Sequence, residues 1–131
     1  GSWFYHHYIQ IALDHGFVPL YSSGENWMSL IDVHDCCSLA LHISKQSKFF
    51  KIVNLYNPNL IVKQIEFVEI ISEILNIPIK KVNLRKKILR DNAFNEAMRF
   101  SLRVKSIHTD LYKNYQFKIN DLKTLISQNI K

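Results

Sequence analysis

The clearest pattern in this chain is a helical one, in which apolar side chains recur three and four positions apart between residues 63 and 75. Lysine or glutamate occupies positions 63, 66, 69 and 73 on the opposite face. Asn76 and Pro78 follow and favour termination of a helix. The pattern predicts an amphipathic helix over 63–75, whose buried face consists of Ile65, Phe67, Val68, Ile70, Ile71, Ile74 and Leu75.

A second helical spacing lies near the N-terminus. Apolar residues recur at helical intervals over 3–14, and Gly16 can end that helix because glycine adopts the left-handed backbone of a helix C-terminus without strain. Residues 17–21 then favour a short extended segment. Pro19 lacks a backbone donor, so we expect this segment to lie at the edge of a sheet.

The middle of the predicted fold is organised by residues 23–44, SGENWMSLIDVHDCCSLALHIS. A turn over 22–26 leads to a strand predicted at 30–33. Asp35 is placed to cap a helix over 35–44, because its carboxylate can accept hydrogen bonds from N–H groups of the first turn. The spacing predicts that this helix buries Cys36, Leu39, Ala40 and Ile43.

Less regular patterns predict the other elements. Residues 49–56, FFKIVNLY, alternate and favour a strand, and a turn over 57–59 follows it. Ser106 can cap a short helix that ends at Leu111, and Asp121 can cap a last helix over 122–130. Residues 79–84 and 103–105 can be extended, and 86–100 has a helical spacing.

The composition is that of a folded globular protein, because 47% of the residues are hydrophobic and only 21% are charged. We predict one domain over 1–131 of mixed α/β class, with helices packed on short strands. No apolar run approaches the roughly 20 residues of a membrane span, and no signal peptide pattern is visible. Residues 1–2 look like an expression scar.

Two adjacent cysteines, Cys36 and Cys37, lie inside a predicted helix. Neighbours on a helix point about 100° apart, so the pair cannot form an unstrained disulfide. Free thiols suit a reducing compartment, and we expect a cytoplasmic protein. These cysteines do not form a recognised zinc motif with His34 and His42, and no nucleophile elbow is present, so we predict no metal and no catalytic residue.

The formal net charge of +6 permits an anionic partner. One basic segment could make the chain a small, non-enzymatic binding module. Aromatic residues do not interleave with its charges, so a solvated surface is favoured over a nucleic-acid site. The segment lies at 80–90 and contains Lys80, Lys81, Arg85, Lys86, Lys87 and Arg90.

Four motifs in order resemble NAD(P)-dependent epimerases and dehydratases, the extended and atypical short-chain dehydrogenases. GENWMSLIDVHD resembles the family's G-x-x-N-x-x-S-x-I-x-V-x-D segment, and FKIVNLYNPNLIVKQIEFVEIISEILNIPI resembles its Y-N-(turn)-E-(helix)-L-G-x-P segment. FSLRVKSIHTDL resembles the family's S-x-R-V-S-N-x-x-L segment. YQFKINDLKTLI resembles the family's last segment, in which an aromatic residue precedes a helix. The resemblance covers roughly 17–130 and implies the C-terminal, substrate-binding part of a Rossmann-type enzyme.

Motifs of the nucleotide-binding half are absent from this sequence. Three glycines cannot build a glycine-rich phosphate loop, and no tyrosine is followed four residues later by the lysine of the family's Tyr-x-x-x-Lys pair. Met28 stands where nucleotide-sugar members often have an arginine. The resemblance therefore implies that NAD or NADP binds elsewhere in a parent protein, and that this fragment holds no cofactor and is inactive alone.

The resemblance also suggests substrate-binding residues and partners. Arg103 falls on the family's late R-V position, where its guanidinium could hold a phosphate or carboxylate at two points. Asn26 and Trp27 lie in the turn beside the predicted strand and could contact a small-molecule substrate. The partners expected are the missing nucleotide-binding domain and a second copy of the chain. The second copy would contact an apolar face containing Trp3, Phe4 and Tyr8.

Overall fold

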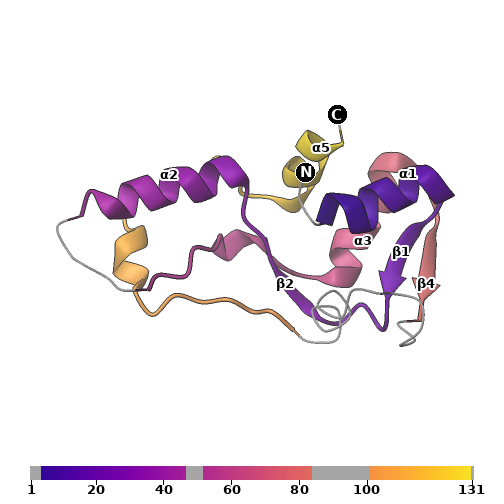
Figure 1. Ribbon diagram of the computed structural model, residues 1–131, viewed down its shortest axis with the longest axis horizontal. Coiled ribbons are helices and arrows are strands. Elements are labelled where there is room, and N and C mark those ends of the chain that lie inside the picture. The colour runs from indigo at the N-terminus through magenta and orange to yellow at the C-terminus, as the bar shows by residue number, and fades with distance from the viewer. Residues whose placement is uncertain (1–3, 47–51, 84–100, 131) are drawn as a thin grey trace.

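The computed structural model describes residues 4–46, 52–83 and 101–130, and the predicted helix at 86–100 lies outside these ranges (Figure 1). The described residues form a mixed α/β fold, as predicted, with helices packed around two small two-stranded sheets. β1 (Val18–Tyr21) pairs in parallel with β4 (Ile79–Val82), and β2 (Trp27–Ser29) pairs antiparallel with β3 (Ile61–Lys63). The predicted extended segments at 17–21 and 79–84 are therefore confirmed where β1 and β4 lie, at 18–21 and 79–82, and residue 84 lies outside the described ranges.

The N-terminal helix begins as a π-helix, η1 (Tyr5–Gln10), and continues as α1 (Ile11–His15). Gly16 ends it as predicted, with φ of 70° and its N–H bonded to the carbonyl oxygen of Ala12 at 2.9 Å. Pro19 of β1 lies opposite Lys80 of β4. Within the described part of the chain β1 pairs with β4 alone, so Pro19 lies at a sheet edge and no ladder hydrogen bond is lost.

The best-defined prediction, the helix at 63–75, is confirmed as α3 (Gln64–Leu75). Phe67, Val68 and Ile71 are buried, whereas the three glutamates on the opposite face are exposed. Asn76 ends α3 in the left-handed region with φ of 54°. The 3.6-residue period determined this element because nearly the whole apolar stripe faces the core.

The second long helix, α2 (Val33–Ser44), corrects four predictions. The strand expected at 30–33 lies earlier, as β2, and the helix starts two residues sooner than 35. Its N-cap is Asp32, whose Oδ1 accepts hydrogen bonds from the N–H groups of His34 at 2.8 Å and Asp35 at 3.2 Å. Asp35 therefore caps nothing and lies inside the helix. On the face expected to be buried, Ala40 is exposed.

The strand predicted at 49–56 is wrong for its described part, because residues 52–56 belong to neither sheet. The turn that follows is the short 3-10 helix η2 (Pro58–Leu60). Residues 103–105 form no strand. Ser106 accepts a hydrogen bond from the N–H of His108 at 3.2 Å, and the short helix it precedes is η3 (Thr109–Tyr112), a 3-10 turn.

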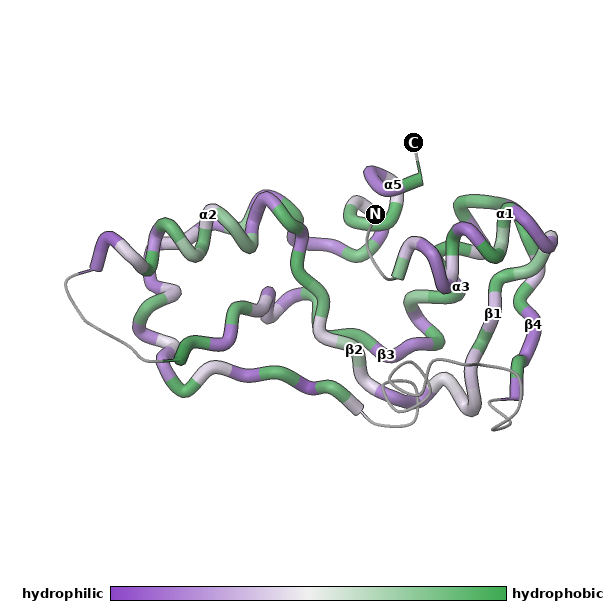
Figure 2. The backbone as a smooth tube through the Cα atoms, in the orientation of Figure 1, coloured by the Kyte–Doolittle hydropathy of each residue, from purple (hydrophilic) through white to green (hydrophobic). Residues whose placement is uncertain are grey.

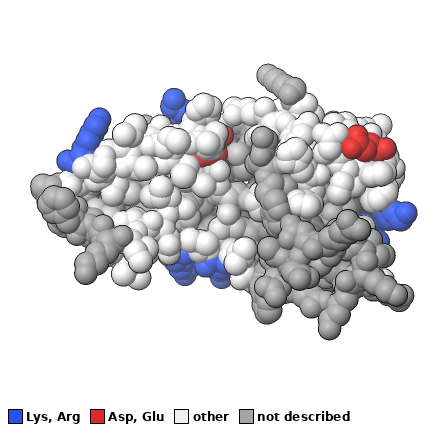
Figure 3. Space-filling model, in the orientation of Figure 1, with Lys and Arg blue, Asp and Glu red and all other residues white. Residues whose placement is uncertain are grey.

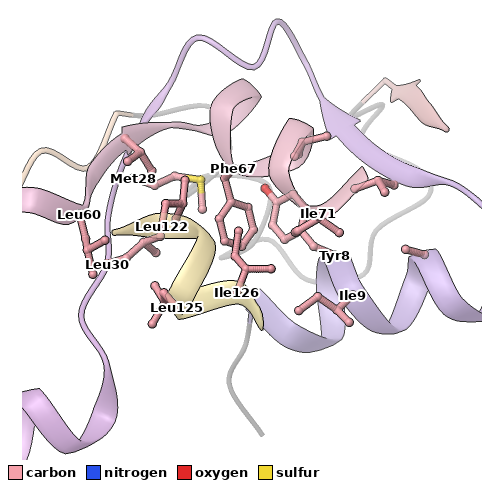
Figure 4. Close-up of a cluster of buried hydrophobic side chains, with 14 of the residues drawn as sticks. Tyr8, Ile9, Met28, Leu30, Leu60, Phe67, Ile71, Leu122, Leu125 and Ile126 are labelled. Carbon is pink, nitrogen blue, oxygen red and sulfur yellow. The ribbon is translucent and has the colours of Figure 1, made fainter. Parts of the chain in front are cut away.

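The last helix is α5 (Leu122–Asn129), and Asp121 caps it as predicted by accepting a hydrogen bond from Thr124 N–H at 2.8 Å. Its apolar side packs beside α3 and the N-terminal helix in one core (Figure 4). Figure 2 shows apolar positions gathered where these elements meet. The most buried large side chains of this core are Tyr8, Leu60, Ile71 and Ile126.

Tyr8 corrects the expected apolar contact face. Its side chain is fully buried and its ring meets those of Tyr21 and Phe67 at centroid distances of 5.5 and 5.2 Å. Phe4 is half-buried against Phe67, and Trp3 lies outside the described residues. Tyr8 is thus core and cannot contact a second copy, and the oligomeric state stays a prediction. No helix in the described ranges has the length and apolarity to cross a membrane.

Candidate substrate-binding surface

The turn at 22–26 is fixed to the start of α3. Ser22 and Gly24 have positive φ, and a Cβ on Gly24 would lie 2.6 Å from Leu20 Cδ1. The carbonyl oxygens of Gly24 and Asn26 accept hydrogen bonds from Ile65 N–H at 2.9 Å and Gln64 N–H at 3.0 Å. The turn therefore holds the next residue, Trp27, at a defined place on β2.

Asn26, one of the three predicted site residues, points into the core. It is 8% exposed, and its Oδ1 accepts a hydrogen bond from Gln64 Nε2 at 2.7 Å. Gln64 Oε1 in turn accepts one from Tyr21 N–H at 2.7 Å, so the two amides connect the turn to β1. Asn26 Nδ2 is buried and has no hydrogen-bond partner in the described residues. Asn26 thus supports the turn from beneath rather than lining the surface.

Residues 101–104 are attached to β2 by four hydrogen bonds. Trp27 N–H donates to Ser101 Oγ at 3.2 Å, and Trp27 O accepts from Leu102 N–H at 2.9 Å. Ser29 Oγ donates to Leu102 O at 2.7 Å and accepts from Val104 N–H at 2.9 Å. Sequence reasoning missed Ser29 and Ser101, because nothing in their spacing shows that segments more than 70 residues apart will meet.

This attachment brings together the other two predicted residues, Trp27 and Arg103. The guanidinium carbon of Arg103 lies 4.8 Å from the centre of the Trp27 ring, within the range of a cation–π contact. Lys63, directly opposite Trp27 on β3, places its Nζ 6.0 Å from the same ring. Trp27 is half-buried and Arg103 is exposed, so an aromatic ring and two cations share one accessible surface. We call Trp27, Lys63 and Arg103 the cationic surface.

Among the described residues, Lys63 has a counterion and Arg103 has none. Lys63 Nζ lies 2.6 Å from Glu25 Oε2, and this hydrogen bond is the main reason why the pKa of Lys63 is raised. Both side chains are partly or largely exposed, so solvent screens the pair. Arg103 is therefore the better candidate for a ligand anion, because stacking on an indole leaves the edge of a guanidinium available for hydrogen bonds.

A separate apolar pocket of about 620 Å³ opens beside the N-terminal helix. Its walls include Phe4, Ile9, Leu30, Phe67 and Leu125. Neither Trp27 nor Arg103 lines it, so the cationic surface and the pocket are distinct features.

Of the six lysines and arginines of the basic segment at 80–90, Lys80 and Lys81 lie in the described residues, and both are exposed on β4. Lys80 Nζ lies 4.8 Å from the centre of the Phe17 ring. Figure 3 shows lysine and arginine side chains at several separate places on one face of the molecule. The other four basic residues of the segment lie outside the described residues, so its role as a binding site for an anionic partner stays a prediction.

The N-termini of helices α2, α3 and α5 do not fit the pyrophosphate of NAD or NADP. Such a site needs unpaired N–H groups and a close glycine backbone. The carboxylates of Asp32 and Asp121 already occupy the ends of α2 and α5, and their negative charge opposes a phosphate. The turn carbonyls at 24 and 26 occupy the end of α3. Within the described ranges, no three His, Cys, Asp or Glu side chains are placed to hold a metal.

Comparison with known proteins identifies the fold. No protein-family model matches this chain, and no curated protein matches it. Its structure is similar to that of dTDP-glucose 4,6-dehydratase from Bacillus anthracis str. Ames, solved in complex with NAD, with a TM-score of 0.61 and 19% sequence identity. The likeness covers 91% of this chain and 36% of the dehydratase chain. The chain thus has the mixed α/β fold of part of a Rossmann-type dehydratase and spans little more than a third of its length.

Proposed function

We propose that this chain is the substrate-binding, C-terminal portion of an NAD(P)-dependent epimerase, dehydratase or reductase. One observation carries the proposal: the likeness in fold to the dehydratase covers 91% of this chain. The four sequence motifs over 17–130, in the family's order, support the same assignment.

The proposal divides the chemistry between two portions. NAD or NADP would be held by a nucleotide-binding portion outside these residues, and would supply hydride transfer there. This chain would bind and orient the substrate and exclude water from it. On its own it would neither bind the dinucleotide nor catalyse a reaction, in keeping with helix ends already occupied by Asp32 and Asp121.

Within this portion, Arg103 and Trp27 are the residues we propose for substrate contact. The guanidinium carbon lies 4.8 Å from the centre of the indole ring, and this contact would restrict the side chain and so lower the entropic cost of forming two parallel hydrogen bonds to an anion. The substrate would therefore carry a phosphate or a carboxylate. Asn26 would act indirectly, by holding the turn that precedes Trp27.

Binding of the cofactor is tested by calorimetry on two proteins: the 131-residue chain, and the product of the complete open reading frame that contains it. We expect the longer protein to bind NAD(H) or NADP(H) and the chain alone to bind neither. Micromolar binding of either dinucleotide to the chain alone would contradict the proposal that the cofactor binds outside these residues. A longer protein that binds neither dinucleotide would contradict the family assignment.

Binding at Arg103 is tested by fluorescence of Trp27 in a Trp3→Phe background, which leaves one tryptophan. Titration with inorganic pyrophosphate and with citrate should change the emission, and Arg103→Lys should weaken that response because lysine lacks the two-point fork. Lys105→Arg is the matched control, since Lys105 is also exposed and lies two residues away. Equal responses from both variants would remove Arg103 from the site.

A further inference from the structure

The strand β4 pairs on one side with β1 and has no other strand neighbour in the part of the chain that the structure describes. Figure 1 shows both strands at the end of the molecule opposite α2. All four residues of β1 are buried, whereas the first three residues of β4 are exposed and Val82 is half-buried. Successive residues of a strand point to opposite faces of the sheet, so both faces of β4 carry accessible side chains.

Every second residue of β4 directs its backbone toward β1. The carbonyl oxygen of Pro78 accepts a hydrogen bond from Val18 N–H at 2.9 Å, and that of Val82 accepts one from Ser22 N–H at 3.3 Å. Because the N–H and C=O of one strand residue point to the same edge, and successive residues alternate between the two edges, Lys80 also faces β1. The even-numbered residues therefore form the ladder with β1.

The odd-numbered residues, Ile79 and Lys81, direct their backbone groups to the outer edge. No hydrogen bond between described residues uses the N–H or C=O of either one. Both residues are exposed, Ile79 by 38%. A row of unpaired backbone donors and acceptors is what the edge of a sheet presents to an added strand.

This edge is positively charged. Lys80 and Lys81 are exposed on opposite faces of the strand, and neither has an acidic partner among the described residues. On one face, Lys80 Nζ lies 4.8 Å from the centre of the Phe17 ring. The two strands and the residues that flank them, 15–24 and 74–83, contain no aspartate or glutamate. The sheet therefore has no acidic side chain of its own to compensate the two lysines.

The two lysines oppose pairing of this edge with a second copy of the chain. Two copies of β4 that pair antiparallel about a two-fold axis would place Lys80 opposite Lys80, or Lys81 opposite Lys81, in the registers with the most overlap. Like charges directly opposite each other in a sheet are destabilising, and lysine is a common residue on edge strands for this reason. A partner for this edge therefore has to carry negative charge.

The backbone groups of the edge distinguish between two kinds of anionic partner. The phosphate oxygens of a nucleic acid accept hydrogen bonds and could pair with the N–H groups of Ile79 and Lys81. They cannot donate to the C=O groups of the same residues. An extended polypeptide offers one N–H and one C=O per residue and can pair with both. An acidic polypeptide is therefore the anion that satisfies the whole edge.

We propose that the outer edge of β4 binds an extended acidic peptide, which adds a third strand to this sheet. The peptide residues opposite Lys80 and Lys81 would be aspartate or glutamate, and those opposite the apolar residues at the two ends of β4 would be apolar. This order, apolar-acidic-acidic-apolar, is the same in both directions and fits parallel or antiparallel addition. The site is separate from the cationic surface and does not depend on the proposed function.

Fluorescence anisotropy with a labelled synthetic peptide, Thr-Ile-Glu-Glu-Val-Thr, tests the charge preference. Lys80→Glu combined with Lys81→Glu should weaken binding by about 10-fold or more, because two attractive cross-strand pairs become repulsive. The same double variant should bind Thr-Ile-Lys-Lys-Val-Thr more tightly than the wild type does. Lys113→Glu combined with Lys118→Glu is the matched control and should bind as the wild type, since both lysines are exposed and lie outside the two sheets.

Amide hydrogen exchange tests whether the peptide binds as a strand. In the free chain, the amides of Ile79 and Lys81 should exchange quickly. Saturation with the acidic peptide should slow the exchange of both by about 10-fold or more, as expected for amides paired in a sheet. The amides of Lys80 and Val82 face β1, so they are the internal reference and should change little.

Results of two kinds would overturn the proposal. Binding of the acidic peptide without slower exchange at Ile79 and Lys81 would show charge attraction without strand addition. Absence of binding, or equal binding by wild type and the Lys80→Glu, Lys81→Glu variant, would show that the lysines only protect the edge.

The other kind would identify a different occupant of the edge. Slower exchange of Ile79 and Lys81 that depends on protein concentration, without peptide, would identify a second copy of the chain. Tighter binding of a single-stranded oligonucleotide than of the peptide, lost in the same double variant, would identify nucleic acid.

Discussion

Asp35 and Ile119 are 84 residues apart in the chain, yet the buried carboxylate of Asp35 accepts the backbone N–H of Ile119 at 3.0 Å. The other carboxylate oxygen accepts Lys118 N–H at 3.0 Å and lies 3.3 Å from the Tyr115 hydroxyl. Asp35 is only 1% exposed. A single side chain of α2 therefore fixes the segment that leads into α5.

Replacing Asp35 by alanine should destabilise the chain by about 3 kcal/mol. Two backbone N–H groups would lose a charged acceptor, and each buried donor left unpaired costs about 1–3 kcal/mol. The loss exceeds the roughly 1 kcal/mol that a helix cap contributes. Urea unfolding gives the free energy, with Asp32→Ala as the control because Asp32 is the cap of α2. Equal losses for the two variants would show that the contacts to 118 and 119 add nothing.

Gly24 and Gly16 should respond differently to alanine. Both have positive φ, so each substitution carries the cost of a left-handed backbone, about 1–2 kcal/mol. A Cβ at Gly24 would also lie 2.6 Å from Leu20 Cδ1, whereas one at Gly16 would meet nothing within 4 Å. Thermal unfolding of the two variants should therefore show the larger loss at 24. Equal losses of stability in the two variants would mean that the Leu20 side chain moves aside without cost.

Ser29→Ala should release residues 101–104 from β2. The substitution removes two hydrogen bonds, worth about 1–2 kcal/mol together, and should separate Arg103 from Trp27. The pyrophosphate response of Trp27 fluorescence should fall with it. Ser44→Ala is a suitable control, because that hydroxyl bonds only within its own helix, to Leu41 O at 2.9 Å. An undiminished response in Ser29→Ala would show that β2 does not position Arg103.

Asp121 should make stability depend on pH in the acid range. The hydrogen bond from Thr124 N–H lowers the pKa of this carboxyl in the folded state below its ordinary value of 3.8. The unfolded chain therefore takes up the proton first, so the stabilisation is complete above about pH 4 and disappears as pH falls through the folded pKa. The difference in melting temperature between wild type and Asp121→Asn should shrink as the pH falls below 3.8. A difference that stays constant on acidification would exclude this linkage.

Regular periodicity made α3 predictable from sequence, and the caps Gly16, Asn76 and Asp121 were predictable because each acts on neighbouring residues. Cap assignment failed at α2, where Asp32 and Asp35 both precede apolar residues. Choosing between two aspartates required knowing that residues 118 and 119 need an acceptor. That information lies in the tertiary structure and not in the local sequence.

The candidate site was likewise predictable only in part. The family resemblance singled out Trp27 and Arg103, and the structure places the Arg103 guanidinium carbon 4.8 Å from the centre of the Trp27 ring. It did not show that Asn26 would turn inward, because burial of an amide depends on a partner such as Gln64, 38 residues away. The strand expected at 49–56 has the right composition but lacks a sheet neighbour in the described residues, and composition cannot supply a neighbour.

The core of Figure 4 unites Tyr8, near the start of the chain, with Ile126, near its end. A ribosome must therefore complete α5 and release it from the exit tunnel before this core can close. Until then the apolar faces of η1 and α3 are exposed to solvent, and we expect chaperones to bind them during synthesis. A chain that stops after residue 121 should be degraded rather than accumulate as a shortened, folded protein.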